Sequence, residues 1–324
     1  MFGLEWNAFL PGVLSLWRIA LPAIFLGCLL GSLLKDTALW VVMGKLMYPL
    51  AKLGRLSRGS ATFLAFSLIN YFTAKTLLAS MKLDGKMEDN EIVFSYLVSA
   101  FPSGVHFLIF YIAPALFSSL GWRLGLIYSS LYVLINLIIC VTGLLMGRKI
   151  ARGGGVVSNV ETEKPGDIFA GTSNVREKIV TSLKTAVKQF YRLALVFMPV
   201  TLFSGAMLKH PAVIELLGKI APLLDRVGLP APALLAIAAG IPSMMAGIAT
   251  MGPVVKQGLL TEQEVLVTLL IVSILHSFYE LFSSVMATNI SIFGANLGFR
   301  LTFTALAVRV AASLSLIVCI VLLY

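Results

Sequence analysis

A few polar and charged side chains stand inside long apolar stretches of this chain, where they could bind a polar solute or move a proton. The sharpest candidate is Glu280, which follows His276 by four residues. Residues four apart share one helix face, so a His–carboxylate pair or a proton relay is available there. The same spacing also suits a buried hydrogen-bonded clasp that only fixes helix packing. A carboxylate in an apolar helix is costly unless it is neutralised or paired, so we expect Glu280 to face the interior of a bundle.

Other polar residues in apolar stretches complete the set of candidates. Lys75 suits an anionic solute or an ion pair with Glu280, and it also lies near enough to Lys82 to snorkel to the membrane surface. Amides inside a membrane either contact a ligand or hydrogen-bond to neighbouring helices. Arg309, seven residues into the last apolar stretch, is expected to snorkel. The predicted substrate-binding residues are Asn70, Lys75, Ser103, His106, Ser243, His276, Glu280 and Asn289.

The motifs of enzymes and metal sites are missing from the sequence. There is no HExxH and there are 3 histidines, while Cys28, Cys140 and Cys319 each stand alone in an apolar run. Walker A, GxGxxG and GxSxG motifs are absent as well. We therefore predict no catalytic residue, no metal, no cofactor and no enzymatic activity.

Composition indicates a polytopic membrane protein. The mean hydropathy is +0.94. Only 12% of residues are charged, against about 25% in soluble domains. The net charge of +10 does not indicate a nucleic-acid partner, because nine Lys and Arg residues are concentrated in the polar stretch 147–192. The positive-inside rule places that stretch in the cytoplasm, so we expect a multi-pass protein in the plasma membrane of a prokaryotic cell, with the lipid bilayer as its partner.

The chain contains an internal repeat. Residues 18–54 recur at 192–228, so that a shift of 174 carries Gly31 onto Gly205 and Gly44 onto Gly218. The same shift relates Ser103 to Ser277 and His106 to Glu280, and Leu120–Leu124 recurs with slippage at Leu297–Leu301. Duplicated membrane halves are typical of secondary transporters, in which the substrate site lies at the seam between the repeats near the bilayer midplane.

Each half contains five apolar segments, which predicts an all-α transmembrane bundle. They lie at 12–34, 37–51, 61–80, 91–119 and 124–146, and again at 187–208, 211–224, 231–255, 264–293 and 302–323. The predicted units are a first repeat at 1–149, a cytoplasmic linker with an amphipathic helix at 150–191, and a second repeat at 192–324. Five crossings per half make the repeats inverted, with both termini extracytoplasmic. This arrangement leaves Lys52, Arg55 and Arg58 on the outer side, and the repeats become parallel if 37–51 and 211–224 are re-entrant.

Glycine and proline residues predict broken helices in the third and fourth segments. The principal breaks are expected at Pro102 with Gly104 and at Gly240 with Pro242. Further breaks are expected at 113–114, 252–253, 276–277 and 288–291. Backbone groups freed at such breaks cannot face lipid, so they must be buried in protein or line a polar cavity.

The run Gly240-Ile241-Pro242-Ser243-Met244-Met245-Ala246 resembles the Gate, or nucleoside-recognition, domain family. That family includes spore maturation proteins A and B and the membrane part of ferrous-iron transport protein B. The resemblance implies two Gate domains in one chain and a permease whose broken helices form the substrate pathway. Asn70-Tyr71-Phe72 and Phe278-Tyr279-Glu280 could serve a nucleoside, whereas the absence of cysteine before Pro242 argues against ferrous iron.

The expected function is secondary transport of a small polar solute, either nucleoside-like or an organic anion, with coupling to protons or another cation through His276 and Glu280. Two alternatives remain open from the sequence: an ion channel-like pathway, and a non-transporting membrane scaffold or partner subunit. The sequence is also compatible with a homo-oligomer.

Overall fold

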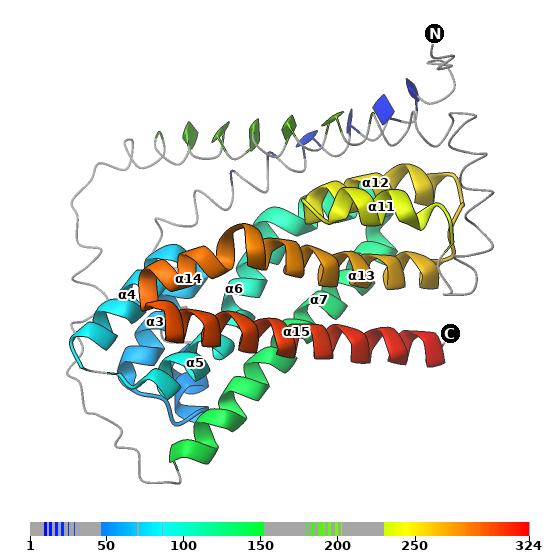
Figure 1. Cartoon of the computed structure of the whole chain (residues 1–324). Coiled ribbons are helices and arrows are strands. Elements are labelled where there is room, and N and C mark those ends of the chain that lie inside the picture. The colour runs from blue at the N-terminus through cyan, green and yellow to red at the C-terminus, as the bar shows by residue number, and fades with distance from the viewer. Residues whose placement is uncertain are drawn as a thin grey trace.

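The computed structural model describes residues 47–69, 71–85, 87–151 and 230–323, together with single positions between 10 and 29 and between 180 and 202. The described part is helical throughout, with turns between the helices (Figure 1). Asn70 and the predicted linker core at 152–179 lie outside the described residues, as do most of the first two apolar segments of each half.

The first described unit is a helical hairpin. Helix α3 (Arg58–Ile69) and helix α4 (Tyr71–Leu83) pack against each other, with Phe63, Leu64 and Leu78 fully buried. Each arm has fewer than the roughly 20 residues that a membrane crossing needs. The segment predicted as one span at 61–80 is therefore two short helices, and the sequence analysis missed this division.

A long bent helical stretch follows. It comprises α5 (Asp89–Val98), α6 (Ala100–Phe107), a π-helical turn η1 (Leu108–Ile112) and α7 (Ala113–Ala151). The backbone leaves the helical region inside α7 at Gly121, where φ is 77° and ψ is 179°. These angles belong to a region that is accessible almost only to glycine. The break predicted at Pro102 and Gly104 falls three residues earlier in the structure, at Ser99, where α5 ends and α6 begins. Pro102 lies in the first turn of α6, where its missing N–H leaves no helical hydrogen bond unmade.

The second half opens with another helical hairpin, formed by α11 (Ala233–Gly240) and α12 (Met244–Lys256). The predicted break at Gly240 and Pro242 is confirmed. A Cβ on Gly240 would meet Val272 Cγ1 at 2.3 Å and Gly247 Cα at 3.3 Å, so the lack of a side chain allows this close helix packing. The predicted break at 252–253 is wrong, since α12 continues through the buried Pro253.

The last stretch is α13 (Glu262–Glu280), a π-helical turn η2 (Leu281–Val285), α14 (Met286–Phe293) and α15 (Ala295–Leu323). Thr261 and Glu264 form a capping box at the start of α13. Gly294, with φ 82° and ψ 165°, separates α14 from α15. Residues 276–277 and 288–291 lie inside helices, so the breaks predicted there are wrong. The irregular turn is instead η2.

The order of elements in the two halves is the same. Each half has a helical hairpin, then a helix that ends in a π-helical turn, a short helix, a glycine at positive φ and a long final helix. The two glycines, Gly121 and Gly294, are 173 positions apart. This register replaces the one inferred from Leu120–Leu124, which the sequence pattern aligned with Leu297–Leu301 at a shift of 177.

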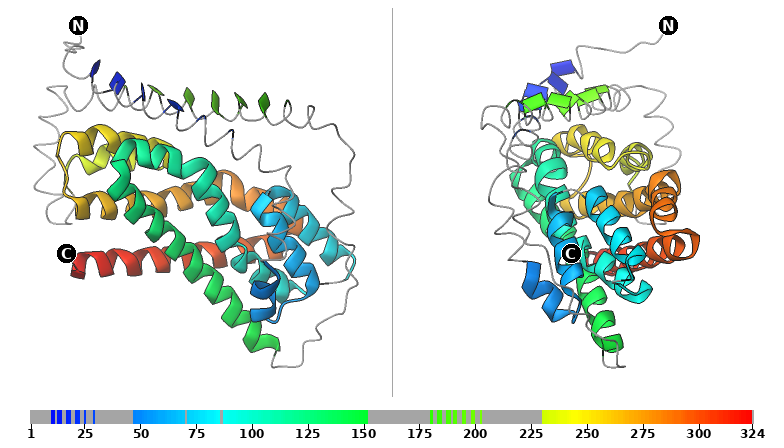
Figure 2. Two further views of the ribbon diagram at one scale, coloured as in Figure 1. Left: turned by 180° about the vertical axis from the view of Figure 1, so that it is seen from behind. Right: turned by 90° about the vertical axis from the view of Figure 1, so that its left-hand side faces the viewer.

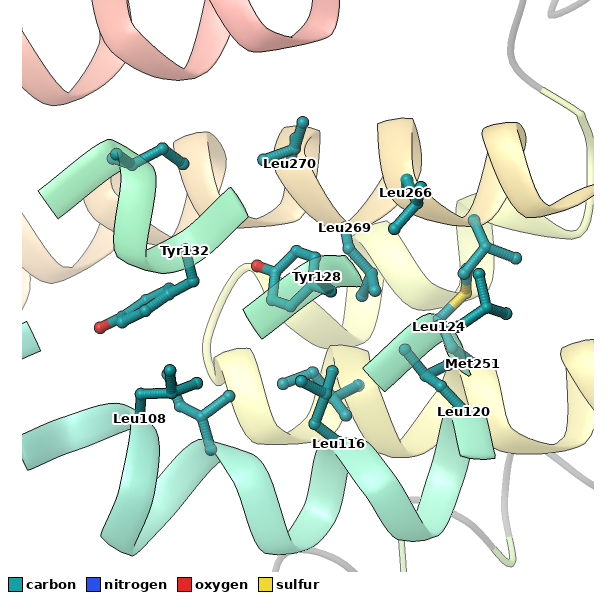
Figure 3. Packing of buried hydrophobic residues seen from close by; sticks show 14 of the residues in the cluster. Leu108, Leu116, Leu120, Leu124, Tyr128, Tyr132, Met251, Leu266, Leu269 and Leu270 are labelled. Carbon is teal, nitrogen blue, oxygen red and sulfur yellow. The ribbon is translucent and has the colours of Figure 1, made fainter. Parts of the chain in front are cut away.

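Three helical stretches of the described chain are long and apolar enough to cross a membrane: Asp89–Lys149, Glu262–Glu280 and Ala295–Leu323. They indicate a membrane location. The final part of α7 and the whole of α15 cross each other and run in broadly opposite directions (Figures 1 and 2). Tyr128 of α7 lies within the larger apolar core, which also holds Leu116, Leu269 and Met251 (Figure 3).

Candidate functional site

A polar group lies at the centre of the two long final helices. Arg309 is the middle residue of the 29-residue helix α15, about 21 Å from either end at 1.5 Å per residue. Half the hydrocarbon core of a bilayer is only about 15 Å thick. Arg309 therefore lies far from both ends of α15, whereas the sequence analysis placed it seven residues into the last apolar stretch. A bilayer centred on α15 would place the Cα of Arg309 too deep for easy snorkelling. Its Nη2 instead lies 3.4 Å from Oδ1 of Asn136 on α7, at the long end of the hydrogen-bond range.

Asn136 and Arg309 occupy equivalent positions, because the shift of 173 that relates Gly121 to Gly294 also relates these two residues. Asn136 is buried, and its Nδ2 donates to the carbonyl of Tyr132 at 2.8 Å. A contact between equivalent residues of two repeats lies on the axis that relates them. This pair therefore marks the seam between the halves.

The central cluster, which we define as Tyr132, Asn136, Glu280 and Arg309, includes one predicted site residue. The side chains of Tyr132, Asn136 and Arg309 adjoin one another, and Glu280 is close enough for its charge to act on the hydroxyl of Tyr132. Glu280 is the last residue of α13, directly before η2. It is exposed, so the expectation that it faces the interior of the bundle is wrong. The central cluster thus combines a cation, a carboxylate, a phenol and an amide, which are donors and acceptors suited to a polar solute.

Helix α6 approaches the central cluster through Gly104. A Cβ at Gly104 would lie 2.6 Å from Cγ of Asn136, so only glycine fits there. His106 follows two residues later and contacts the rings of Phe110 and Tyr111, with centroid separations of 4.9 and 6.0 Å. Ser103 Oγ donates to the carbonyl of Ser99, the residue between α5 and α6, at 2.6 Å.

His276 and Ser243 stabilise the turn of the α11–α12 hairpin. The Nδ1 atom of His276 lies 3.0 Å from the carbonyl oxygen of Ile241, a carbonyl at the end of α11 that the helix itself cannot satisfy. Ser243 is the N-cap of α12, and its hydroxyl accepts from the backbone N–H of Ala246 at 3.3 Å. Both side chains thus form hydrogen bonds with backbone groups that the helix break leaves without a helical partner.

Lys75 and Asn289 meet in a second polar group, which we call the lysine clasp: Lys75, Tyr96, Asn289 and Thr302. Lys75 is 3% exposed and Asn289 is fully buried, and Lys75 Nζ donates to Asn289 Oδ1 at 3.0 Å. The amide Nδ2 donates to Tyr96 Oη at 3.2 Å and to Thr302 Oγ1 at 2.9 Å. Lys75 also lies over the ring of Tyr96, at 5.4 Å from its centroid. Of the alternatives that the sequence left open for Lys75, snorkelling to the membrane surface is therefore excluded.

The equivalent positions in the other half are almost entirely apolar. The shift of 174 carries Lys75 to Ala249 and Tyr96 to Leu270, and the shift of 173 carries Asn289 back to Leu116. All three counterparts are fully buried in the larger apolar core, and Leu116 and Leu270 lie on either side of Tyr128 (Figure 3). The fold therefore has one lysine clasp and one apolar copy of it.

The predicted residues thus fall into separate places rather than one cavity. Lys75 and Asn289 form the lysine clasp, Glu280 belongs to the central cluster with His106 nearby on α6, and Ser243 and His276 belong to the hairpin turn. The site residues that sequence reasoning missed are Tyr132, Asn136 and Arg309 in the central cluster, and Tyr96 and Thr302 in the lysine clasp. Among the residues that the structure describes, no group of three His, Cys, Asp or Glu side chains could hold a metal ion.

Comparisons with known proteins reveal distant relatives. No protein-family profile matches the chain, and no solved structure matches it. The chain is similar to an uncharacterised protein of Methanocaldococcus jannaschii, MJ0880, at 24% identity over 91% of this chain and 94% of that protein. It is also similar to a second uncharacterised protein of that organism, MJ1589, at 22% identity over 77% of this chain and 93% of that protein.

Proposed function

We propose that this protein is a secondary transporter or permease for a small polar solute, nucleoside-like or an organic anion, built from two inverted repeats. The observation that carries the proposal is the position of Arg309, at the centre of an apolar helix and in contact with its equivalent, Asn136. A charge at the bilayer centre costs about 2.5–3.5 kcal/mol on insertion scales, and such residues usually mark a solute or ion pathway. The two repeats resemble Gate domains in layout.

Two contacts between helix ends support inversion. Arg300, near the start of α15, donates to Asn90 Oδ1 at the start of α5 at 2.7 Å. Arg123, just after Gly121, pairs with Glu262 at the start of α13 at 3.2 Å. The helices that follow the two hairpins, α5 and α13, therefore begin at opposite ends of the molecule. Parallel repeats would begin at the same end.

The charges at the two ends support a cytoplasmic position for the end of α7. Arg148 Nε donates to the carbonyl of Leu53, and Ser57 N–H donates to Glu91 at the start of α5, so these segments share one end. Lys52, Arg55, Lys82, Arg148, Lys149 and Arg300 all belong to that end. The opposite end has Arg123 and Lys256 together with Glu262 and Glu264. Because α3 and α4 form a hairpin, Lys52 and Arg55 no longer conflict with the positive-inside rule.

In this proposal the two hairpins enter from opposite faces, and the central cluster binds the solute between them. Arg309 supplies donors for an anionic or carbonyl group, and Asn136 and Tyr132 supply both donors and acceptors. Glu280 serves as the protonation or cation-coupling group. The π-helical turn directly after Glu280 supports this role, because π-helical turns occur frequently at functional sites.

The test is uptake of radiolabelled uridine and succinate into proteoliposomes, with and without a proton gradient. Arg309→Gln should lower the initial uptake rate by at least tenfold, about 1.4 kcal/mol or more, because it removes the central charge. Glu280→Gln should remove the response to the gradient. The matched control is Arg123→Gln, which breaks only an exposed ion pair and should leave uptake unchanged.

Each result bears on a different part of the proposal. Uptake that is unaffected by Arg309→Gln would exclude the central cluster as the site, and uptake unaffected by Glu280→Gln would remove that carboxylate from the mechanism. Ion current that rises without saturation would favour a channel-like pathway instead.

A further inference from the structure

We infer that the cytoplasmic end of α7 carries a binding site for the phosphate group of an anionic phospholipid. The site is a pocket of about 490 Å³ lined by Pro49, Lys52, Leu53, Arg55 and Arg148. No acidic side chain is among the described residues that line it. The inference depends on a membrane location for the chain but not on transport.

The three basic side chains come from two segments that the fold locks together. A Cβ on Gly147 of α7 would lie 2.7 Å from the carbonyl oxygen of Gly54, so the two segments are in close contact at that point. Arg148 Nε donates to the carbonyl of Leu53. A guanidinium has five N–H donors in a planar fork, so one bond to a carbonyl leaves donors for a phosphate oxygen. Lys52 and Arg55 add two further cations at the same pocket.

The backbone at Arg55 is a second, independent pointer. Leu56 N–H donates to the carbonyl of Ala51 at 3.0 Å, and Arg55 N–H donates to that of Lys52 at 3.1 Å. These bonds form a Schellman motif, in which the residue after the cap is usually glycine. Here that residue is Arg55, with φ at 53°, the one non-glycine residue at positive φ in the described part of the chain. A side chain kept in a strained conformation where glycine would be easier suggests a functional use.

The surroundings favour a lipid over a soluble phosphate compound. Arg148 is near the C-terminal end of α7, where the membrane-crossing stretch Asp89–Lys149 reaches the bilayer surface. Tyr48, Leu53 and Leu145 are 50%, 51% and 54% exposed beside the basic residues. Leu145 is three residues before Arg148 and shares its helix face, so an acyl chain can follow α7 while its phosphate occupies the pocket. Juxtamembrane basic clusters attract anionic lipid in this way.

The test is native mass spectrometry of the full chain in detergent, titrated separately with dioleoylphosphatidylglycerol and dioleoylphosphatidylcholine. The double variant Lys52→Gln/Arg148→Gln should weaken binding of phosphatidylglycerol by at least about tenfold, because two charge-assisted contacts are lost. Binding of phosphatidylcholine should stay unchanged. Arg123→Gln, at the opposite end of the molecule, is the matched control and should bind within twofold of the parent chain.

Arg55→Gly separates binding from folding. Glycine adopts positive φ without strain, so this variant should unfold at an equal or higher temperature and yet bind the anionic lipid more weakly. Anionic-lipid binding that is unchanged in both Arg55→Gly and the double variant would overturn the inference. Inorganic phosphate that binds the pocket and displaces the lipid at equal concentration would overturn the lipid assignment and identify a soluble phosphate compound as the ligand.

Discussion

Lys75 and Asn289 are 214 positions apart in the chain, yet they form a direct buried hydrogen bond. Burying a lysine is unfavourable unless its donors are satisfied, and the amide oxygen of Asn289 and the face of Tyr96 both contribute to this. The clasp joins α4 and α5 of the first half to α14 and α15 of the second. Its counterpart of Ala249, Leu270 and Leu116 shows that the same frame also accepts an apolar cluster.

We predict strong energetic coupling within the lysine clasp. Asn289→Leu alone should lower the free energy of unfolding by about 1–3 kcal/mol, because it removes an acceptor from Lys75 and a donor from Tyr96 and Thr302. Lys75→Ala combined with Tyr96→Leu and Asn289→Leu should cost much less than the sum of the single changes. That triple variant reproduces the side chains of the apolar counterpart. Detergent unfolding followed by circular dichroism gives these values.

A matched control for the clasp is Ser130→Ala, which removes only an exposed hydroxyl bonded to the carbonyl of Leu126. It should change the free energy of unfolding by less than about 0.5 kcal/mol. Additive effects of the three clasp substitutions would show that their side chains do not act as one unit.

At the scale of elements, the two positive-φ glycines divide each repeat into a short helix and a long one. Gly121 and Gly294 have nearly the same backbone angles, and a Cβ on either residue would meet no atom within 4 Å. Their requirement for glycine is therefore conformational and not steric. The chain direction changes at these positions, and so they set where α7 resumes and where α15 begins.

We predict that Gly121→Ala and Gly294→Ala each destabilise the protein by about 1–3 kcal/mol, since their backbone region is nearly restricted to glycine. Asn should be no better than Ala at either position. Gly258, by contrast, has φ at 64° and closes a Schellman turn after α12 together with Leu259. Asn tolerates that left-handed conformation, so Gly258→Asn should cost less than Gly121→Asn. Equal costs in a thermal unfolding series would contradict this assignment.

The sequence predicted the helical class and the break at Gly240 and Pro242, but it misplaced most of the other breaks. A proline motif does not reveal whether a helix begins near it or continues through it: Pro102 lies in the first turn of α6, whereas α12 continues through Pro253. The division between α3 and α4 has no glycine or proline signal. The repeat itself could have predicted it, because the turn at 241–243 maps to 67–69, next to the start of α4.

The candidate site was harder to predict than the fold. Placing the start of the last helix at 302 instead of 295 made Arg309 look like a residue near a helix end, and this hid its central position. The partners of Lys75 and Arg309 come from helices far apart in sequence, and hydropathy contains no information about such pairs. Glu280 was found because its charge in an apolar segment is visible locally.

At the scale of the whole molecule, the proposed inversion explains why similar halves have different polar side chains. A two-fold axis in the membrane plane exposes one hairpin to each side, so the copies meet different solutions and need not keep the same residues. Asn136 against Arg309 and the lysine clasp against its apolar counterpart are the clearest divergences.

Equivalent positions give a direct test of this arrangement. Asp84 and Gln257 follow the two hairpins and are 173 positions apart, and Lys149 and Leu322 are equivalent positions at the ends of α7 and α15. In a background with Cys28, Cys140 and Cys319 changed to alanine, single cysteines at these four positions are treated with a membrane-impermeant maleimide. Inverted repeats predict that cysteines at 257 and 322 react in intact cells, whereas those at 84 and 149 react only after permeabilisation. Parallel repeats place both members of each pair on the same side, so matching reactivity within either pair would overturn the inversion. If the repeats are not inverted, the argument that the seam at Arg309 is a solute site open to each face in turn also fails.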